Sequence, residues 1–475
     1  MKLTQGHVLA SLTEYNPLLN TTPIRAVQID SREVEAGDLF VAFQGERVDG
    51  HAYVNQAYKN GAQVALVEKP VALDDASIPT INVNETLPTK LSAPFCLLVD
   101  NTEKRLQQVA SYWRDQFPNL TVIGITGSIG KTSTKELVNS VLSYQFETHK
   151  TPKNYNNEIG LPLTVLQIDG SKSHAVLEMG MYAKGEIALL CEIAKPQIGM
   201  VTNIGPVHLS RLGSIEAIVE AKRELVEALP ADGVAILNRD DERVMNMAPF
   251  TKAQIFTYGL SKEADLWADR VISRGLEGIK FFLHYQGRSW RVHVPLLGEH
   301  SVHTSLRAAA VGLACGMEMN DIVAGLQSSP NQVRLITVRG PKNSLIIDDT
   351  YNASPDSVIA ALNLLNDLEG RRIAVLGDML ELGSEELKGH KLVGRRASTV
   401  ADYLVTIGPL GKIIGEEALN VGMPPDQVYM FDETDSAAKH LETHIKKGDI
   451  ILIKGSLGMQ MDRIVWQLSR AKGKV

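Results

Sequence analysis

The stretch from Thr121 to Asn139 constrains the fold more than any other part of the chain. Its first residues are apolar and mostly β-branched, which predicts a short buried strand, and from Thr132 onward the apolar positions fall at helical spacing. The turn between them reads Gly-Ser-Ile-Gly-Lys-Thr over 127–132. Glycines let successive backbone N–H groups point into one hollow, and the following helix adds the positive end of its dipole. The stretch therefore predicts a strand–loop–helix unit that binds phosphate.

The side chains of this loop suit a nucleoside triphosphate with Mg²⁺. Lys131 can bridge the outer phosphates, and the Thr132 hydroxyl can hold the metal ion. The general phosphate-binding loop has a glycine five residues before Gly130, where this chain has Ile125, so the match is to a shorter pattern. A solvated lysine after an ordinary glycine turn is the alternative, and the order of strand, loop and helix favours the phosphate site. The predicted nucleotide-binding residues of the loop are Gly127, Ser128, Ile129, Gly130, Lys131, Thr132 and Ser133.

The composition limits the class of protein. The chain has 475 residues, of which 44% are hydrophobic, so we expect about three domains. The net charge of −7 argues against a general nucleic-acid-binding protein. No apolar run reaches membrane-spanning length, the N-terminus lacks the apolar core of a signal peptide, and the cysteines are few and far apart. These features lead us to expect a cytoplasmic protein with no membrane insertion.

Short apolar strands alternate with helical segments along most of the chain, which predicts an α/β fold with mostly parallel sheets. The predicted domains are a small N-terminal α/β domain over 1–98, a central P-loop domain over 99–330 and a Rossmann-like domain over 331–475. Short alternating runs over 254–297 indicate a β-rich insertion in the central domain. Ligands of parallel sheets bind at the carboxyl ends of the strands, so residues with reactive side chains at those ends are the candidates for a site.

Loops of the first domain carry Ser31, Arg32, Arg47 and His51. Their hydroxyl, cationic and imidazole groups suit an anionic ligand such as a pyrophosphate. Turn chemistry combined with surface charge is the alternative, and from these residues alone it is the favoured one. Ser31, Arg32 and Arg47 are the candidate substrate-binding residues of this domain.

Three features after the P-loop helix carry possible chemistry. Asn154, Asn156 and Asn157 form a polar loop that can grip substrate or phosphate, and an ordinary Asx-rich turn is the alternative. Glu178 ends an apolar strand and can hold Mg²⁺ directly or through water, whereas a solvated glutamate is the alternative. His208 follows the next strand, where a metal or phosphate role competes with a purely structural one.

The segment from Ser214 to Leu229 predicts an amphipathic helix with an unusual lysine. Lys222 lies in the apolar stripe that also contains Ile218 and Leu225, whereas Glu224 is expected nearer the solvent. The ammonium group can reach solvent from such a position along its own aliphatic stem. Burial would instead depress the pKa of Lys222 and expose a neutral amine, which can react with CO₂ to give a carbamate. A carbamate is a carboxylate-like metal ligand.

Several motifs occur together in a set order. They are Gly-Lys-Thr at 130–132, Asn-Asn-x-Ile-Gly-x-Pro at 156–162, Glu178, His208, Lys222 and Asp-Asp-x-Tyr-Asn at 348–352. As a set they resemble the Mur ligases, cytoplasmic enzymes of peptidoglycan precursor synthesis, and the resemblance covers nearly the whole chain. Three further stretches are most similar to those of the last amino-acid-adding ligase of the family: Asp-Ser-Arg at 30–32, Gly-Asp-Met-Leu-Glu-Leu-Gly at 377–383 and Lys-Gly-Ser at 454–456. The Asp-Asn-Pro-Arg tetrad of the ligase that adds the third residue is absent from the sequence.

The resemblance implies an ATP-dependent ligase that uses Mg²⁺ and joins D-alanyl-D-alanine to UDP-N-acetylmuramoyl-tripeptide. It implies a first domain that binds the UDP-sugar peptide, with Ser31 and Arg32 near the uridine diphosphate. Thr132 and Glu178 would hold one Mg²⁺, and His208 with carbamylated Lys222 would help to hold a second. The catalytic residues implied are Lys131, Lys222, His208 and Glu178, and the further nucleotide contacts are Asn238, Arg334 and Asp349. A monomer is expected.

The sequence also departs from the family pattern. Ile129 stands where relatives often have Asn or Ser, and Ser301 and Thr304 replace two asparagines of the family helix that begins near Gly298. These changes put the nucleoside contacts of that helix in doubt. Two other functions stay open: another amide ligase of the superfamily, similar to folylpolyglutamate synthase, and a non-catalytic protein whose binding depends on nucleotide.

Overall fold

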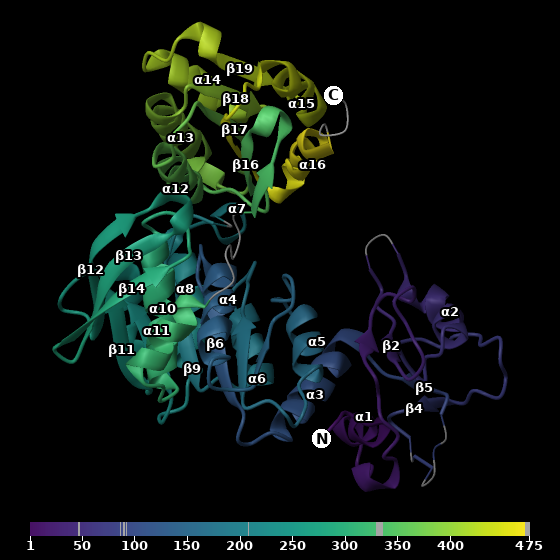
Figure 1. Cartoon of the computed structure of the whole chain (residues 1–475). Coiled ribbons are helices and arrows are strands. Elements are labelled where there is room, and N and C mark those ends of the chain that lie inside the picture. The colour runs from purple at the N-terminus through teal and green to yellow at the C-terminus, as the bar shows by residue number, and fades with distance from the viewer. Residues whose placement is uncertain are drawn as a thin grey trace.

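The computed structural model describes residues 1–45, 48–85, 87–88, 91, 93–207, 209–328 and 336–470. The described strands form three sheets that follow one another along the chain, and helices cover them (Figure 1). The predicted α/β class is confirmed, because parallel strands joined by helices make up most of each sheet. Within these described ranges, no helix has the length and apolar character needed to cross a membrane.

The N-terminal sheet consists of five parallel strands in the order β1-β2-β3-β5-β4. Its strands are β1 (Val27–Gln28), β2 (Leu39–Val41), β3 (Val64–Val67), β4 (Thr80–Asn82) and β5 (Phe95–Leu98). Successive residues of a strand point to opposite faces. Phe40 and Ala65 therefore pack with α2 (Val54–Lys59), whereas Leu39 and Val64 pack toward α1 (Gln5–Leu12).

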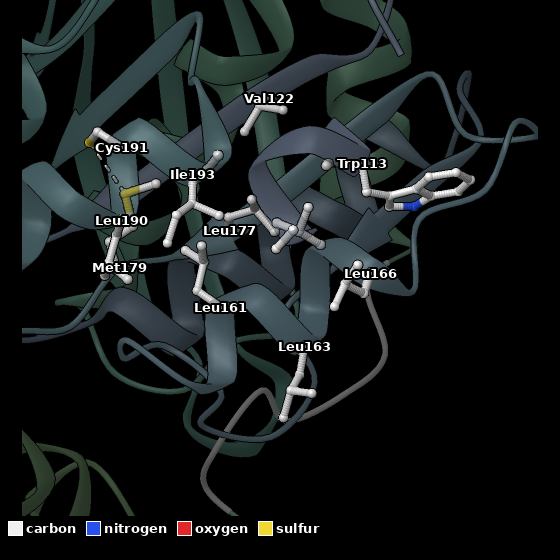
Figure 2. Packing of buried hydrophobic residues seen from close by; sticks show 14 of the residues in the cluster. Trp113, Val122, Leu161, Leu163, Leu166, Leu177, Met179, Leu190, Cys191 and Ile193 are labelled. Carbon is white, nitrogen blue, oxygen red and sulfur yellow. Dashed lines mark hydrogen bonds between the residues drawn. The ribbon is translucent and has the colours of Figure 1, made fainter. Parts of the chain in front are cut away.

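Helix α3 (Thr102–Asp115) joins the N-terminal and central sheets. Its Trp113 is fully buried and donates its indole N–H to the carbonyl of Ile168 at 2.9 Å. Figure 2 shows this part of the core, where side chains of α5 (Gly160–Leu166) and α6 (Glu186–Ala194) pack beside Leu177. One apolar cluster thus spans the boundary predicted near residue 98. That boundary stays a prediction, and the one at residue 330 lies outside the described residues.

The central sheet has nine strands in the order β14-β13-β12-β11-β10-β9-β6-β8-β7. Pairing is parallel from β7 to β12 and antiparallel from β12 to β14. The strands are β6 (Thr121–Thr126), β7 (Thr148–Lys150), β8 (His174–Glu178), β9 (Ile198–Val201), β10 (Val234–Asn238), β11 (Gln254–Gly259), β12 (Leu266–Ser273), β13 (Ile279–Tyr285) and β14 (Arg288–Val294). The predicted β-rich insertion over 254–297 is confirmed.

Helices cover both faces of this sheet, so that almost every residue of its inner strands is buried. Val122 packs toward α3, α5, α6 and α8 (Ile215–Glu227), and the next residue, Ile123, packs toward α4 (Lys131–Leu142) on the other face. That second face is also covered by α10 (Ser301–Ala314) and α11 (Met319–Gln327). The short helices α7 (Leu209–Leu212) and α9 (Glu242–Met245) follow β9 and β10. The carboxyl ends of β6, β8 and β9 are therefore side by side.

The C-terminal sheet follows the order β15-β16-β20-β17-β18-β19, with only β15 antiparallel among the described strands. Its strands are β15 (Ile336–Arg339), β16 (Leu345–Asp349), β17 (Arg372–Gly377), β18 (Tyr403–Ile407), β19 (Val428–Phe431) and β20 (Ile450–Lys454). One face packs on α12 (Pro355–Asn366), α13 (Glu386–Val400) and α14 (Gly411–Asn420), and the other on α15 (Thr434–His444) and α16 (Asp462–Arg470). The C-terminal sheet, with helices on both faces, lies above the central sheet in Figure 1.

Candidate active site

The predicted phosphate loop lies between β6 and α4, as the sequence pattern requires. Gly127 has φ +143 and Gly130 has φ +83, both in the region that favours glycine. A Cβ on Gly127 would lie 1.9 Å from the Thr202 hydroxyl oxygen, so close packing also excludes a side chain there. The Ser128 and Ile129 N–H groups donate to the backbone and side-chain oxygens of Asn203, at 3.0 and 2.9 Å. The segment after β9 thus fixes the loop.

Two lysines meet at one carbonyl of this loop. The Lys131 ammonium donates to the Gly127 carbonyl oxygen at 2.7 Å, and Lys222 of α8 donates to the same oxygen at 3.0 Å. Lys222 is only 2% exposed, between the fully buried Ile218 and Leu225. Burial and, secondarily, the charge of Lys131 hold the pKa of Lys222 well below its usual range. The sequence left two alternatives for Lys222, an ammonium group that reaches solvent and a buried amine. The structure agrees with the second.

The expectation that Glu224 lies nearer the solvent is wrong. Glu224 is 8% exposed, and its carboxylate accepts hydrogen bonds from the N–H groups of Gly185 at 2.7 Å and Ala188 at 3.0 Å. These donors belong to the N-terminus of α6, whose dipole favours a carboxylate. The reason for the error is tertiary: α8 packs against both the sheet and the neighbouring helix α6, so that more than one stripe of α8 is covered.

Glu178 lies at the carboxyl end of β8 with only 2% of its surface exposed. One carboxylate oxygen accepts from the Thr132 hydroxyl at 2.9 Å, and the other accepts from the Asn156 amide at 2.8 Å. A hydroxyl beside a carboxylate is the oxygen donor set that Mg²⁺ prefers. Groups of three or more His, Cys, Asp or Glu at metal-binding spacing do not occur among the described residues. Thr132 and Glu178 therefore fit a Mg²⁺ that is also held by phosphate oxygens, rather than an all-protein metal cage.

The asparagine loop shapes the local fold and also lines the cavity beside the P-loop. Asn157 accepts from the Gly160 N–H at 2.9 Å, which anchors the start of α5, while Asn156 faces Glu178. Asn154, Asn156 and Asn157 all line one cavity with the P-loop. The loop can therefore form an ordinary Asx turn and line the cavity at the same time.

A cavity of about 680 Å³ lies between the central and C-terminal sheets. It is lined by the P-loop, the asparagine loop, Glu178 and Lys222, and from the C-terminal sheet by Asp349 and Lys454. The last two form an ion pair at 2.7 Å, and Lys454 is almost fully buried. Lys454 was noted in the sequence only as part of the Lys-Gly-Ser stretch, and no role in the site was predicted for it, although a lysine directly after the apolar run Ile450–Ile453 was a signal for one.

A second hollow of about 580 Å³ adjoins the P-loop and contains Asn238, His303 and Arg307. Asn238 is buried and donates to the Thr202 carbonyl at 3.3 Å. Arg307, also missed from the sequence, is buried in α10 and donates to the Tyr258 hydroxyl at 2.8 Å. Its signal was a single cation inside the alanine-rich helix. Burial lowers the pKa of His303 to about 4, with a further contribution from Arg307.

The structure does not bring every predicted residue to the cavity. Ser31 and Arg32 lie in the turn between β1 and β2 and are not among the described residues that line the cavity. Arg32 is exposed and pairs with Asp30 at 2.5 Å, which lowers the pKa of that carboxyl to about 2. Ser31 is buried, and its carbonyl accepts from the Asn60 amide at 2.8 Å. Arg47, His208 and Arg334 lie outside the described residues.

Comparison with known proteins accounts for this architecture. Three family domains match the chain in order: the Mur ligase family catalytic domain at residues 23–112, the Mur ligase middle domain at 125–312 and the Mur ligase glutamate ligase domain at 333–457. A Bacillus subtilis protein named UDP-N-acetylmuramoyl-tripeptide–D-alanyl-D-alanine ligase is 38% identical over 457 residues, covering 95% of each chain.

Solved structures agree with the sequence matches. A crystal structure of MurF from Acinetobacter baumannii superposes with a TM-score of 0.84 at 32% identity and covers 98% of both chains. MurF from Thermotoga maritima in complex with ADP gives a TM-score of 0.79 at 26% identity and covers 94% of this chain and 97% of its own. The order of the three matched domains and the similarity to these relatives over nearly the whole chain point to one family. The chain therefore belongs to the Mur ligase family.

Proposed function

We propose that this chain is an ATP-dependent ligase that joins the amine of D-alanyl-D-alanine to the terminal carboxyl group of UDP-N-acetylmuramoyl-tripeptide. The observation that carries the proposal is the meeting of Lys131, Lys222 and Glu178 around one glycine loop, inside a cavity shared with the C-terminal sheet. The B. subtilis relative, which carries the name of this ligase, supports the choice of substrates. The reaction is a step of peptidoglycan precursor synthesis.

The chemistry follows from the substrates. A carboxylate is a poor acyl donor because oxide is a poor leaving group. In the proposed reaction a carboxylate oxygen attacks the γ-phosphorus of ATP, ADP leaves, and an acyl phosphate forms. The amine of the dipeptide then attacks the acyl carbon, phosphate leaves with the carboxylate oxygen, and the nitrogen loses a proton. Lys131 would neutralise charge on the transferring phosphoryl group, and enclosure between the two sheets would keep water from the acyl phosphate.

The metal chemistry concerns the same residues. We assign Thr132 and Glu178 to one Mg²⁺, which would supply positive charge beside the phosphates. His208 and Lys222 are proposed to help to hold a second ion. The depressed pKa of Lys222 supports carbamate formation, because a neutral amine adds CO₂ and releases one proton. The carbamate would carry the negative charge that a metal ligand needs.

The remaining predicted residues, along the cavity and in the first domain, are assigned to the nucleotide and to the UDP-linked substrate. The backbone of Gly127, Ser128, Ile129 and Gly130, with Ser133, would cradle phosphates, and Asn238, Arg334 and Asp349 would contact the nucleotide. Asn154, Asn156 and Asn157 would hold the peptide end of the UDP-linked substrate, whereas Ser31, Arg32 and Arg47 would bind its diphosphate. We further propose a cytoplasmic monomer with no nucleic-acid partner.

A coupled assay tests the function. Purified protein is mixed with UDP-N-acetylmuramoyl-tripeptide, D-alanyl-D-alanine, ATP and Mg²⁺, and phosphate release is measured while each component is omitted in turn. The proposal expects release only from the complete mixture, together with a UDP-linked pentapeptide. Glutamate and a folate replace the two substrates in a parallel series. Turnover confined to that series would instead identify a folylpolyglutamate synthase-like ligase, and ATP binding without any turnover would identify a binding protein.

A further inference from the structure

Lys135 is a buried cation one turn beyond the P-loop. It is 1% exposed, although it is not among the described residues that line the cavity. Its ammonium donates to the Thr151 carbonyl at 2.9 Å and the Lys153 carbonyl at 3.4 Å. It also lies 3.2 Å from a Glu136 oxygen and 3.9 Å from a Glu178 oxygen. Burying a charge is costly unless it is paired, so this lysine needs the partners that surround it.

The carboxylate of Glu178 connects Lys135 to the site. The oxygen nearest Lys135 is the one that accepts from Thr132. Thr132 and Lys135 are three residues apart in α4 and therefore lie on one side of that helix. Helix α4 thus places both the Thr132 hydroxyl and the Lys135 ammonium beside the same Glu178 oxygen. Together these two groups fix the orientation of that oxygen.

The chain from Thr151 to Asn156 completes the connection. The Thr151 hydroxyl accepts from the Glu178 N–H at 2.9 Å, and Asn156 donates to the second Glu178 oxygen. Between them, Lys153 has a backbone φ of +47, which is strained for a side-chain-bearing residue. Such strain persists only where the surroundings hold it, and the Lys153 carbonyl is one of the two that Lys135 holds.

We propose that Lys135 is a positioning residue that locks the 151–156 segment against Glu178, and so couples metal binding by Glu178 to substrate binding by the asparagine loop. The inference rests on the proposed function for the identity of that substrate. Lys135 itself touches neither nucleotide nor substrate in this account. Its loss would leave the buried Thr151 carbonyl and the part-buried Lys153 carbonyl without this donor, and would free both the strained turn and the Asn156 amide.

Three variants test the coupling: Lys135→Met, Lys135→Arg and the control Lys150→Met. Lys150 pairs with the other oxygen of Glu136, but its side chain is 40% exposed, and it is not bonded to the two carbonyls or to Glu178. Each protein is assayed for the KM of all three substrates, for kcat and for the Mg²⁺ concentration at half-maximal rate. As a readout independent of activity, thermal stabilisation by ADP is measured with and without Mg²⁺.

For Lys135→Met we expect the KM for the UDP-linked substrate and the Mg²⁺ requirement each to rise about tenfold, as losses of residues that support metal ligands do. The KM for the dipeptide should stay within about twofold, because only the UDP-linked substrate is assigned to the asparagine loop. The Mg²⁺-dependent part of the stabilisation by ADP should fall. Lys135→Arg, which keeps the charge, should recover part of the Mg²⁺ effect, and Lys150→Met should resemble the wild type.

Equal changes in all three KM values, or a lower melting temperature with an unchanged Mg²⁺ requirement, would reduce Lys135 to a purely structural residue and overturn the inference. If Lys135→Met does not fold, the same comparison is made with Lys135→Arg, for which a selective rise in the KM for the UDP-linked substrate is expected and a uniform change is contradictory. If the wild type does not use D-alanyl-D-alanine, the proposed function fails. The ADP and Mg²⁺ stabilisation then still decides whether Lys135 supports the metal site.

Discussion

Lys131 and Lys222 share one hydrogen-bond acceptor, the Gly127 carbonyl oxygen, although they come from α4 and α8 on opposite faces of the central sheet. The two ammonium groups are therefore neighbours, and the charge of Lys131 adds to burial in lowering the pKa of Lys222. A lowered pKa favours the neutral amine, which is the form of lysine that is nucleophilic toward CO₂.

Replacement of Lys222 by alanine tests the proposed carbamate, because the variant lacks the amine that would carry this negative charge. We expect ligase activity to fall at least about a hundredfold, the size of effect seen when one preorganised electrostatic group is lost. A short carboxylic acid such as acetate or propionate should restore part of the activity by occupying the space of the carbamate. The measurement is the ligation rate against acid concentration.

Lys222→Arg is the matched control, because it keeps a cation and cannot form a stable carbamate. It should be as inactive as the alanine variant and should not respond to added acid. Rescue of the arginine variant, or full activity of the alanine variant, would exclude a carbamate at this position.

A Gly127→Ala substitution tests the phosphate loop. Its Cβ would lie 1.9 Å from the Thr202 hydroxyl at a φ of +143, so the loop must move. We expect the affinity for ADP in calorimetry to fall about a hundredfold, which corresponds to about 2.7 kcal/mol. Gly213→Ala provides the control, because Gly213 has φ +81 but no atom within 4 Å of the added Cβ. If both variants bind ADP equally well, the close packing of the loop is not needed for nucleotide binding.

The outcome for α8 shows how far a single sequence can lead. Helical periodicity placed Lys222 in the buried stripe, because that stripe depends only on the spacing of apolar residues. Glu224 was misplaced, because its burial depends on α6, a helix brought to it by tertiary packing. The site positions of Lys454 and Arg307 were not predicted for the same reason, because each depends on a partner distant in the sequence. Lys454 pairs with Asp349, and Arg307 donates to Tyr258. Thr132, in the helix that follows β6, and Glu178, at the end of the neighbouring strand β8, were predictable because the carboxyl ends of adjacent parallel strands bring such residues together.

The Glu224 carboxylate should stabilise the start of α6. Glu224→Gln replaces a charged acceptor by a neutral amide, and we expect a local cost of about 2 kcal/mol, within the range for hydrogen bonds to charged groups. Hydrogen exchange at the Gly185 and Ala188 amides should accelerate about thirtyfold if those amides exchange through local opening. Glu220→Gln, which removes an exposed partner of Lys184, should leave both amides unchanged. Equal exchange in all three proteins would contradict the cap.

His303 should make the central domain sensitive to acid. Its folded-state pKa is about 4, lowered by burial and by Arg307, with Asp240 at 3.8 Å as an opposing charge, whereas the ordinary pKa of a histidine is 6.5. Because the unfolded chain binds the proton more tightly, this contribution to stability is complete above pH 6.5 and is lost as the pH falls toward 4. Between pH 7 and pH 5 the loss is about 2 kcal/mol.

The His303→Gln variant should therefore lose about 2 kcal/mol less unfolding free energy than the wild type over that pH change. Urea titrations of both proteins at pH 7 and pH 5 give this difference directly. Parallel losses in the two proteins would show that protonation of His303 does not limit acid stability.

The central claim, activation of a carboxyl group as an acyl phosphate, is tested most directly by isotope transfer. UDP-N-acetylmuramoyl-tripeptide is labelled with ¹⁸O in both oxygens of its reacting carboxyl group, and the complete reaction is run with unlabelled ATP, Mg²⁺ and D-alanyl-D-alanine. If the carboxyl group reacts through an acyl phosphate, each phosphate released carries one ¹⁸O atom, and the new amide keeps the other. Phosphate free of the label, formed together with pentapeptide product, would contradict it.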